Sequence, residues 1–465
     1  MTNQPKDYIK GEGAYALTGE ARALAHPCLT TPVLREFWNN FSFRASTLTV
    51  EECDEYIFTL GEAQAIPLEG YDSVIRVTPQ GIYLTAKGEK ELIRGFMTLL
   101  GLFRATDKEE GSGAELPCCT VYERPTPTFR AVHFCIFPET ELWELRRFIR
   151  FAGALKYTHI VLEFWGMLRY DCMAELAWSH AFSKDEVRPL MDEARELGLE
   201  IIPMFNHWGH APASRVMHGK HVVLDQNPAL QSYFSEDGWC WDIKKTKVRA
   251  LLCSIRRELT ELCGDGSYFH IGCDEAYGFS FTEESIKEIC DFINGIAGEM
   301  QEEGRRILMW GDMLLYYRKE YNPKNRYTCG APTLAAEEDF LQRLDKNIVI
   351  ADWQYDAPQF PVETASVFSQ AGFDCVLCPW DRGVAETRAA LATVREQGLM
   401  GYLHTTWHTL TSGMMYVYMM AQDASYPFNW ASASTATAAL LRKVLPAGGV
   451  YEKAGWSKIQ VHSRW

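Results

Sequence analysis

From residue 127 onward, hydrophobic runs of strand length alternate with helical patterns. This alternation is typical of βα units around a parallel sheet. The predicted strands cover residues 129–134, 158–164, 199–205, 267–272, 306–310, 347–352, 373–378 and 400–406. Helical stretches between them include 183–197, which opens with a capping box, and 246–263. Eight such units over roughly 300 residues predict an α/β fold, a (β/α)8 TIM barrel.

The residues before the barrel follow a different pattern. Residues 73–86 are typical of two strands joined by a turn, and 90–103 have the apolar period of a helix. A polar and then proline-rich stretch follows and marks a boundary. We therefore predict three parts. They are a small α+β N-terminal domain at 1–125, the catalytic barrel at 126–430, and a C-terminal helix and tail that pack on the barrel at 431–465.

Composition narrows the class of protein. The formal net charge is −15, and no cluster of Lys and Arg offers a surface for phosphates, so nucleic acid is an unexpected partner. Residues 1–25 lack the apolar core of a signal peptide, and no run is long enough to span a bilayer. We expect a cytoplasmic protein without a membrane partner, and an oligomer is possible.

The fourteen cysteines are predicted to be buried, reduced thiols rather than a disulfide scaffold. Cys375 and Cys378 have C-x-x-C spacing, but they lie in a strand-like run, which argues against a redox or zinc motif. His207 and His210 form H-x-x-H without the Glu of a zinc-protease motif, which is weak evidence for zinc. We expect neither a metal nor another cofactor.

Active sites of TIM barrels form at the C-terminal ends of the strands. Aromatic and polar residues recur just past those predicted ends: Trp165, Trp208, His210, Asp274, Glu275, Trp310, Asp312, Trp353, Tyr355, Trp380, Asp381 and Trp407. Any one Trp is typical of a buried core. Their shared position instead favours a concave, aromatic-walled pocket, in which sugar C–H faces stack on rings while hydroxyls meet polar groups. The sequence therefore predicts a carbohydrate site.

Asp274 and Glu275 are adjacent, which constrains how they act on a sugar. Most glycosidases use two carboxyls that flank the scissile bond, and neighbouring residues cannot easily do so from opposite sides. A substrate with a 2-acetamido group can supply its own carbonyl oxygen as the nucleophile. Glu275 would then protonate the leaving oxygen, and Asp274 would orient the acetamide and stabilise the positive charge developing on its nitrogen.

The stretch around these acids resembles the glycoside hydrolase family 20 β-N-acetylhexosaminidases. Their H-x-G-x-D-E signature is matched by His270, Gly272, Asp274 and Glu275. The resemblance extends over most of the chain, because the small α+β unit looks like the non-catalytic N-terminal domain of the family. It implies that Glu275 is the general acid and base and that Asp274 holds the acetamido group.

Further residues match by resemblance to other family segments. Arg130 matches an Arg of the first barrel strand that grips sugar hydroxyls, and His210 matches the His of a P-E-x-D-x-P-G-H segment. The remaining substrate-binding candidates resemble the Trp walls and the acetamide-binding Tyr of the family: Trp310, Asp312, Trp353, Tyr355 and Trp407.

The chain also departs from the family pattern at four positions. Met204 and Asn206 stand where the family has Glu and Asp, and Cys135 stands where an Asp usually follows the first-strand Arg. Thr409 occupies the place of a Glu that binds sugar hydroxyls in many members. These departures affect the grip on the terminal sugar, while the Asp-Glu pair is retained.

The resulting hypothesis is an exo-acting, retaining β-N-acetylhexosaminidase that acts on carbohydrates with a terminal GlcNAc or GalNAc. Two alternatives stay open. The first is a conventional two-carboxylate glycosidase on the same barrel, with a second acid such as Asp312 or Asp381. The second is a non-catalytic amino-sugar-binding protein, in which case sugar would bind without turnover.

Overall fold

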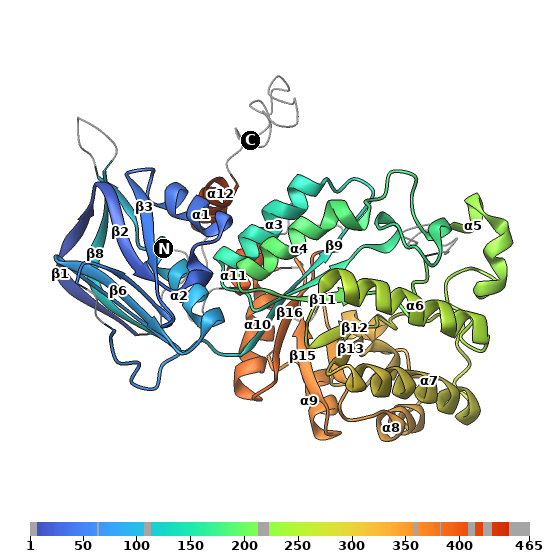
Figure 1. Cartoon of the computed structure of the whole chain (residues 1–465). Helices are drawn as coiled ribbons and strands as arrows, with labels where there is room; N and C mark the ends of the chain where they lie inside the picture. Colours follow the sequence, from blue (N-terminus) through green and yellow to red (C-terminus); the bar gives the residue numbers. More distant parts are fainter. Residues whose placement is uncertain are drawn as a thin grey trace.

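The computed structural model describes residues 7–62, 65–106, 113–212, 223–356, 360–381, 383–407, 414–421 and 430–445. It contains an N-terminal sheet and a closed parallel barrel, which lie side by side in Figure 1. Thr409 and the C-terminal tail at 446–465, for which we made predictions, lie outside the described residues.

The barrel closes through pairing of its last strand, β16, with its first, β9. Its strands follow one another in chain order: β9 (Phe129–Cys135), β10 (His159–Glu163), β11 (Glu200–Met204), β12 (Tyr268–His270), β13 (Arg306–Trp310), β14 (Val349–Trp353), β15 (Asp374–Cys378) and β16 (Gly401–His404). All eight overlap the predicted strands, and the predicted (β/α)8 barrel is confirmed.

Helices cover the outside of the barrel (Figure 1). They are α3 (Leu142–Ala154), α4 (Lys184–Glu196), α6 (Thr246–Cys263), α7 (Glu283–Glu302), α8 (Leu334–Arg343), α9 (Glu363–Gln370), α10 (Val384–Glu396) and α11 (Met414–Met420). The short α5 (Val223–Gln226) lies beyond one end of the barrel, and α12 (Trp430–Val444) packs against α3, α11 and α1. The predicted capping box is present at the start of α4, where Ser183 Oγ accepts from the Glu186 N–H and the Glu186 carboxylate accepts from the Ser183 N–H.

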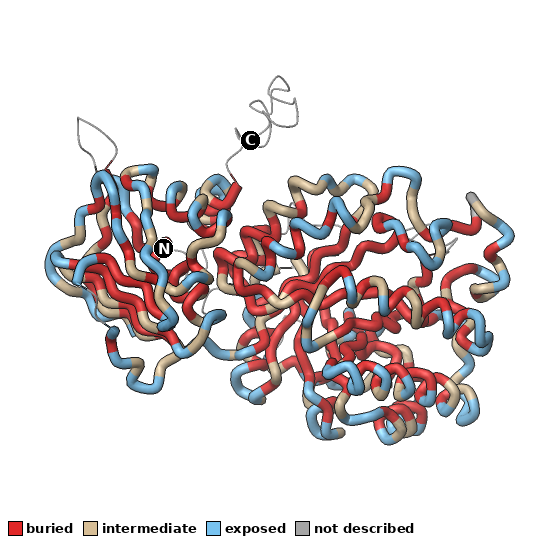
Figure 2. Tube along the Cα trace, in the orientation of Figure 1, coloured by how far each residue is buried: buried red, intermediate tan, exposed pale blue. Residues whose placement is uncertain are grey.

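The barrel strands are largely buried, as the red tube in Figure 2 shows, and apolar side chains line both of their faces. In β14, Val349, Ala351 and Trp353 join the cluster inside the barrel, whereas Ile350 packs in the larger core beneath the helices. The same alternation separates the C-x-x-C pair, with Cys375 in the outer core and Cys378 in the inner one. These two thiols therefore cannot share a ligand.

The N-terminal sheet has the strand order β1-β8-β5-β6-β4-β2-β3, with β7 paired to β8. Its elements are β1 (Asp7–Leu17), β2 (Gly19–Ala25), α1 (Pro32–Phe41), β3 (Ser46–Glu52), β4 (Ile57–Leu60), β5 (Ser73–Thr78), β6 (Gly81–Ala86), α2 (Glu89–Gly101), β7 (Arg104–Thr106) and β8 (Gly113–Glu123). The predicted strand pair and helix correspond to β5, β6 and α2. Helices α1 and α2 lie between the sheet and the barrel (Figure 1).

A buried guanidinium joins the N-terminal sheet domain, the barrel and the last described helix. The Arg150 side chain on α3 is 1% exposed and forms paired hydrogen bonds with the Glu36 carboxylate on α1, both at 2.9 Å. It also donates to Glu193 on α4 at 2.5 and 3.2 Å, and to the Val444 carbonyl on α12 at 2.9 Å. Bidentate charge-assisted bonds of this kind fix geometry as well as charge.

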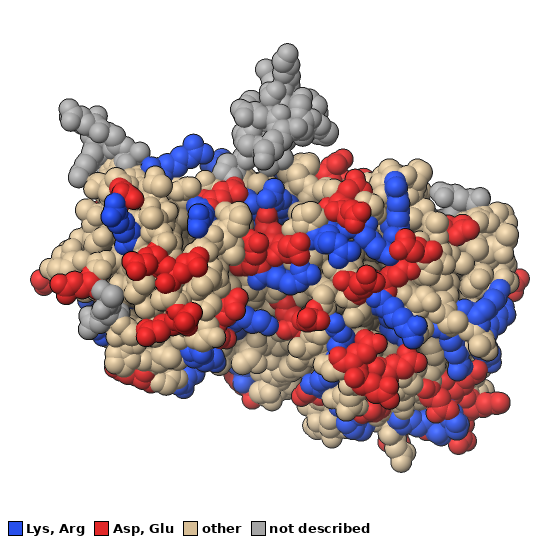
Figure 3. Space-filling model, in the orientation of Figure 1, with Lys and Arg blue, Asp and Glu red and all other residues tan. Residues whose placement is uncertain are grey.

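The surface and the thiols bear on the predicted partners and compartment. On the face in Figure 3, Lys and Arg are interspersed with Asp and Glu and do not gather in one basic patch. None of the helices in the described residues combines the length and apolar character needed to cross a membrane. All fourteen cysteines lie in the described part of the chain, and none of them forms a disulfide.

Candidate active site

Strained backbone gathers at the C-terminal ends of the barrel strands. Nine described residues other than glycine have positive φ, and five of these follow strand ends: Trp165, His210, Cys273, Glu275 and Trp407. Such conformations cost on the order of 1–3 kcal/mol each and persist where surrounding contacts enforce them. The strain therefore marks the same end of the barrel at which the sequence places the candidate site.

Two glycines allow the loops after β11 and β12 to interlock. Gly272 has φ of 66°, and a Cβ there would overlap Asn206 Oδ1 from the neighbouring loop. A Cβ on Gly209 would overlap the Asp274 carbonyl oxygen. The Gly of the H-x-G-x-D-E stretch is thus required by close packing as well as by its backbone conformation. This packing brings the loop that carries His210 against the loop that carries the two acids.

Asp274 and Glu275 converge on a single imidazole nitrogen. His210 Nε2 lies 2.8 Å from Glu275 Oε2 and 3.5 Å from Asp274 Oδ2. The Asp274 side chain is 7% exposed, whereas that of Glu275 is 20% exposed. Both carboxylates therefore lie on the same side of the site, with Asp274 the deeper of the two.

Asp312, just past β13, fixes the position of Glu275 from below. Its Oδ2 accepts from the Glu275 backbone N–H at 2.9 Å, and its Oδ1 accepts from Trp353 Nε1–H at 3.1 Å. Burial and the neighbouring Asp274 carboxylate raise the pKa of Asp312 well above its ordinary value, although the hydrogen bonds it accepts oppose this. Three carboxyls thus share a buried region, which favours retention of a proton among them.

Aromatic side chains from neighbouring strand ends lie in contact. Trp353 and Tyr355 have ring centroids 5.0 Å apart, and Tyr355 lies 5.3 Å from Trp380. Trp407 Nε1–H donates to the Tyr355 hydroxyl at 2.5 Å. Burial raises the pKa of Tyr355, and the charge of Asp274 adds to this, so the phenol stays protonated near the acid.

Trp310 lies one layer lower than the other aromatic candidates. Its side chain is completely buried, and its ring centroid lies 4.3 Å from that of His270 and 5.7 Å from that of Trp407. The sequence predicted that Trp310 belongs to the Trp walls of the site. In the structure it supports the aromatic cluster from beneath and has no exposed surface.

Arg130 does not reach this end of the barrel, so its predicted contact with sugar hydroxyls is wrong. It is the second residue of β9, and its guanidinium donates to the carbonyls of Pro127 at 2.8 Å and Lys156 at 3.1 Å. Both carbonyls precede strands, and Arg130 lines a cavity of about 190 Å³ at the opposite end of the barrel. Its neighbours Phe129 and Ala131 take the inward positions, which turns Arg130 outward.

His207 and His210 point to different partners, which excludes them as a metal pair. The fully buried His207 ring lies with Nδ1 at 2.6 Å from the Phe205 carbonyl. Burial and the charge of Arg256 lower its pKa to about 3, so it is neutral. His210 instead faces the two acids.

Sequence reasoning missed two aromatic residues of the site. Trp239 Nε1–H donates to the Glu275 carbonyl at 2.5 Å, and its ring lies 4.5 Å from that of His210. Tyr277 stacks on Trp239 at 5.3 Å. Burial and a hydrogen bond with the Glu275 carboxylate raise the pKa of Tyr277. Proximity to Glu275 in the chain was the only signal for Tyr277, and Trp239 had none because it lies in a long irregular loop.

Comparison with known proteins relates this arrangement to one family. Residues 161–384 match the model described as glycosyl hydrolase family 20, catalytic domain. Among solved structures, a chitobiase from Flavobacterium johnsoniae has a TM-score of 0.68 at 16% identity, covering 98% of this chain and 73% of that one. A β-N-acetylhexosaminidase from Bacteroides fragilis has a TM-score of 0.65 at 16% identity, covering 98% and 95%.

A further solved structure is similar over nearly the whole described chain. It is a GH20 exo-β-N-acetylglucosaminidase from Vibrio harveyi in complex with N-acetylglucosamine, with a TM-score of 0.66 at 13% identity, covering 96% of this chain and 77% of that one. At such low identities these structures establish the shared fold.

Replacing Gly272 with Ala tests the interlocked loops. We expect Gly272→Ala to lower the free energy of unfolding by about 3 kcal/mol or more, because the new methyl overlaps Asn206. Gly278→Ala is the matched control, since Gly278 has φ of 78° in the same loop but nothing within 4 Å of its Cβ position. It should cost only about 1 kcal/mol of backbone strain. Equal losses in urea unfolding would contradict the packing argument.

Proposed function

The barrel of this chain is a glycosyl hydrolase family 20 catalytic domain, and we propose that the protein is an exo-acting, retaining β-N-acetylhexosaminidase. It removes terminal β-linked N-acetylglucosamine or N-acetylgalactosamine from carbohydrates. The observation that carries the proposal is the approach of Asp274 and Glu275 to the same nitrogen of His210. The similar solved structures, a chitobiase, an exo-β-N-acetylglucosaminidase and a β-N-acetylhexosaminidase, agree with it.

Two acids on one side of a site need a nucleophile from elsewhere. A carboxyl acid and a carboxylate nucleophile that act on one glycosidic bond face each other across it, with the two carboxyl groups roughly 5 Å apart. Asp274 and Glu275 instead share the His210 contact. Asp312 is no substitute nucleophile, because it is 3% exposed and both of its oxygens accept hydrogen bonds. The acetamido oxygen of the substrate fits this requirement.

The reaction then proceeds in two steps. The acetamido carbonyl oxygen attacks C1, the bond from C1 to the leaving oxygen breaks, and Glu275 gives its proton to that oxygen. A water molecule next attacks C1 of the oxazolinium intermediate, the bond from C1 to the acetamido oxygen breaks, and Glu275 takes the proton of the water. Two displacements at C1 retain the configuration of the sugar.

The division of roles follows from exposure and hydrogen bonding. Glu275, the more exposed acid, faces the leaving group, and Asp274, the deeper one, accepts from the acetamido N–H. Tyr355 accepts from Trp407 and keeps its own O–H to donate to the acetamido carbonyl. This pair of contacts aligns the carbonyl oxygen for attack, which is worth several kcal/mol in comparable intramolecular reactions.

We also propose that the enzyme works in the cytoplasm on small oligosaccharides. All fourteen cysteines are without disulfides, which suits a reducing compartment. The mixed charges of the surface in Figure 3 support a neutral carbohydrate substrate over a nucleic acid.

Replacing Glu275 with Gln tests the general acid. On alkyl β-N-acetylglucosaminides, whose leaving groups need protonation, Glu275→Gln should lower kcat/KM by about 100-fold or more. The loss should be much smaller on p-nitrophenyl β-N-acetylglucosaminide and its galacto epimer. Asp381→Asn is the control, and it should keep most of its activity. Unchanged rates for Glu275→Gln on both substrate types would refute the assignment of Glu275 as the general acid. Sugar binding without turnover by the wild type would instead favour a non-catalytic binding protein.

Replacing Asp274 with Asn tests assistance by the substrate. Asp274→Asn should lower kcat on acetamido substrates by about 100-fold, because the amide no longer stabilises positive charge on the acetamido nitrogen. Wild-type protein should release little p-nitrophenol from the plain β-glucoside, which lacks the nucleophile. Equal effects of Asp274→Asn on both sugars, or a covalent sugar adduct on the protein, would favour the two-carboxylate mechanism.

Replacing Asp312 with Asn tests the shared proton. Burial and the Asp274 charge raise the pKa of Asp312 well above its ordinary value, and once Asp312 ionises its charge opposes ionisation of Glu275. Asp312→Asn removes that charge and should move the alkaline limb of the kcat/KM profile to lower pH by roughly one unit. Asp352→Asn is the control, since burial raises the pKa of Asp352 to about 6 but its oxygens bond Thr364 and Gln354. Its profile should keep the wild-type position. An unshifted limb in Asp312→Asn would show that Asp312 does not hold the proton on the acid.

A further inference from the structure

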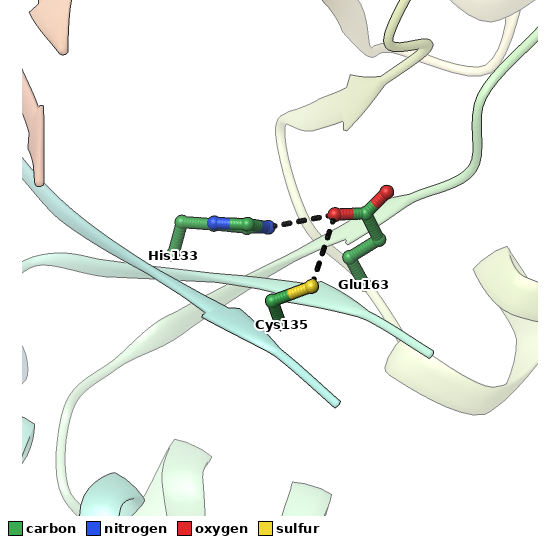
Figure 4. A group of neighbouring side chains, drawn as sticks. All are labelled: His133, Cys135 and Glu163. Atoms are coloured by element: carbon green, nitrogen blue, oxygen red, sulfur yellow. Dashed lines mark hydrogen bonds and ion pairs between the residues drawn. The ribbon is translucent and has the colours of Figure 1, made fainter. Parts of the chain in front are cut away.

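Three potential metal ligands meet inside the barrel, next to the proposed catalytic residues but separate from them. His133 and Cys135 lie on β9 and Glu163 ends β10, and their side chains point toward one another in Figure 4. One ligand atom from each lies within 4.8 Å of the other two. All three residues are at most 1% exposed. Imidazole, thiolate and carboxylate are the three ligand types that zinc takes in proteins.

The barrel topology brings these residues together. His133 and Cys135 are two positions apart on one strand, so their side chains point to the same face, which is the barrel interior. Glu163 pairs directly with Cys135 in the parallel register of β9 and β10. The arrangement therefore rests on regular strands rather than on a loop, and regular strands hold a site precisely.

We propose that His133, Cys135 and Glu163 bind one zinc ion. His133 Nε2 lies 3.0 Å and Cys135 Sγ lies 3.7 Å from Glu163 Oε2. Tetrahedral zinc at ordinary bond lengths sets nitrogen and oxygen ligands about 3.4 Å apart and sulfur and oxygen ligands about 3.6 Å apart. The two measured separations are within about half an ångström of these values, and all three ligand atoms lie within 4.8 Å of one another, so side-chain adjustments can place them around one ion. The Cys135 thiol releases its proton to solvent on binding.

A second layer of contacts holds the ligands in place. Asn206 Nδ2–H donates to Glu163 Oε1 at 2.8 Å, which leaves Oε2 directed at His133 and Cys135. The Thr406 hydroxyl donates to the His133 carbonyl at 2.7 Å. The first of these bonds orients a ligating carboxylate, which strengthens the affinity of a metal site, and the second fixes the backbone of β9 at His133.

His270 is nearby but is not a fourth ligand. Its Nδ1 accepts from the Gly272 N–H at 3.0 Å, so its single proton is on Nε2, which cannot then bind a cation. Three protein ligands leave one position for water, the coordination usual in zinc sites that are not closed. The Trp407 ring lies 4.8 Å from that of His133. An ion that fixes the His133 ring would therefore also steady the aromatic cluster above it. The zinc site uses neither Asp274 nor Glu275 and stands independently of the proposed hydrolysis.

Metal analysis of the purified full chain tests the site. Protein produced in zinc-supplemented medium and passed through a desalting column should carry about one zinc ion per chain, measured by inductively coupled plasma mass spectrometry. Cys135→Ser and Glu163→Gln should each lower this content at least tenfold. Cys378→Ser is the matched control, because Cys378 is another buried thiol that faces the barrel interior, and it should retain the ion. Circular dichroism checks that each variant is folded.

Cobalt provides a readout that needs no variant. Wild-type protein, stripped with a chelator and reloaded with cobalt(II), should show the near-ultraviolet charge-transfer band of a thiolate bound to cobalt, and Cys135→Ser should lack it. Stripping should also lower the thermal midpoint of the wild type, and zinc should restore it. Wild-type protein that binds neither zinc nor cobalt, or variants that bind as much as the wild type, would overturn the proposal. A different metal in the purified protein would overturn the choice of zinc. Glycosidase activity decides none of these outcomes.

Discussion

The hydrogen bond from the Glu275 backbone N–H to Asp312 connects the parts of the site on which the proposed chemistry depends. It holds a strained residue at the end of β12, while the other oxygen of Asp312 holds Trp353 of β14. One buried carboxyl therefore positions the acid, its loop and the aromatic cluster together. It also holds, beside Asp274 and Glu275, a buried carboxyl whose pKa burial and the Asp274 charge raise well above its ordinary value. Geometry and proton affinity are thus set by the same group.

How far the sequence predicted the structure depended on burial. The barrel strands were predicted because they are apolar on both faces and leave continuous runs. Strand β3, with the sequence STLTVEE, is mostly exposed or half-exposed, and β1 is similar, so neither gave such a run. A local motif located Asp274 and Glu275, whose spacing in the chain fixes their spacing in space. The match of Arg130 to the first-strand Arg of the family gave a wrong prediction, because matching one residue does not determine the face of the strand to which its side chain points.

Two of the departures from the family pattern belong to one interacting group. Cys135 and Asn206 both contact the Glu163 carboxylate, one through sulfur and the other through its amide. Taken singly, each change suggested a weakened grip on the sugar. Because both residues contact the Glu163 carboxylate, the two departures are structurally linked and are best considered together. Contacts across β9, β10 and the loop after β11 could not be read from positions 28 to 43 residues apart in the chain.

Arg150 has a consequence for how the chain is made. The guanidinium has all of its hydrogen-bond acceptors only when Glu36, Glu193 and the Val444 carbonyl are in place. During synthesis, residues near 444 leave the ribosome long after the sheet domain and most of the barrel. Until then Arg150, which joins the sheet domain to the barrel, lacks the Val444 carbonyl as an acceptor. Helices α1, α3 and α4 therefore pack together before α12 is present. Final docking of the two domains is therefore coupled to translation of the last described helix, and the barrel cannot be excised from the sheet domain without exposing Arg150, a charge that the whole molecule keeps buried.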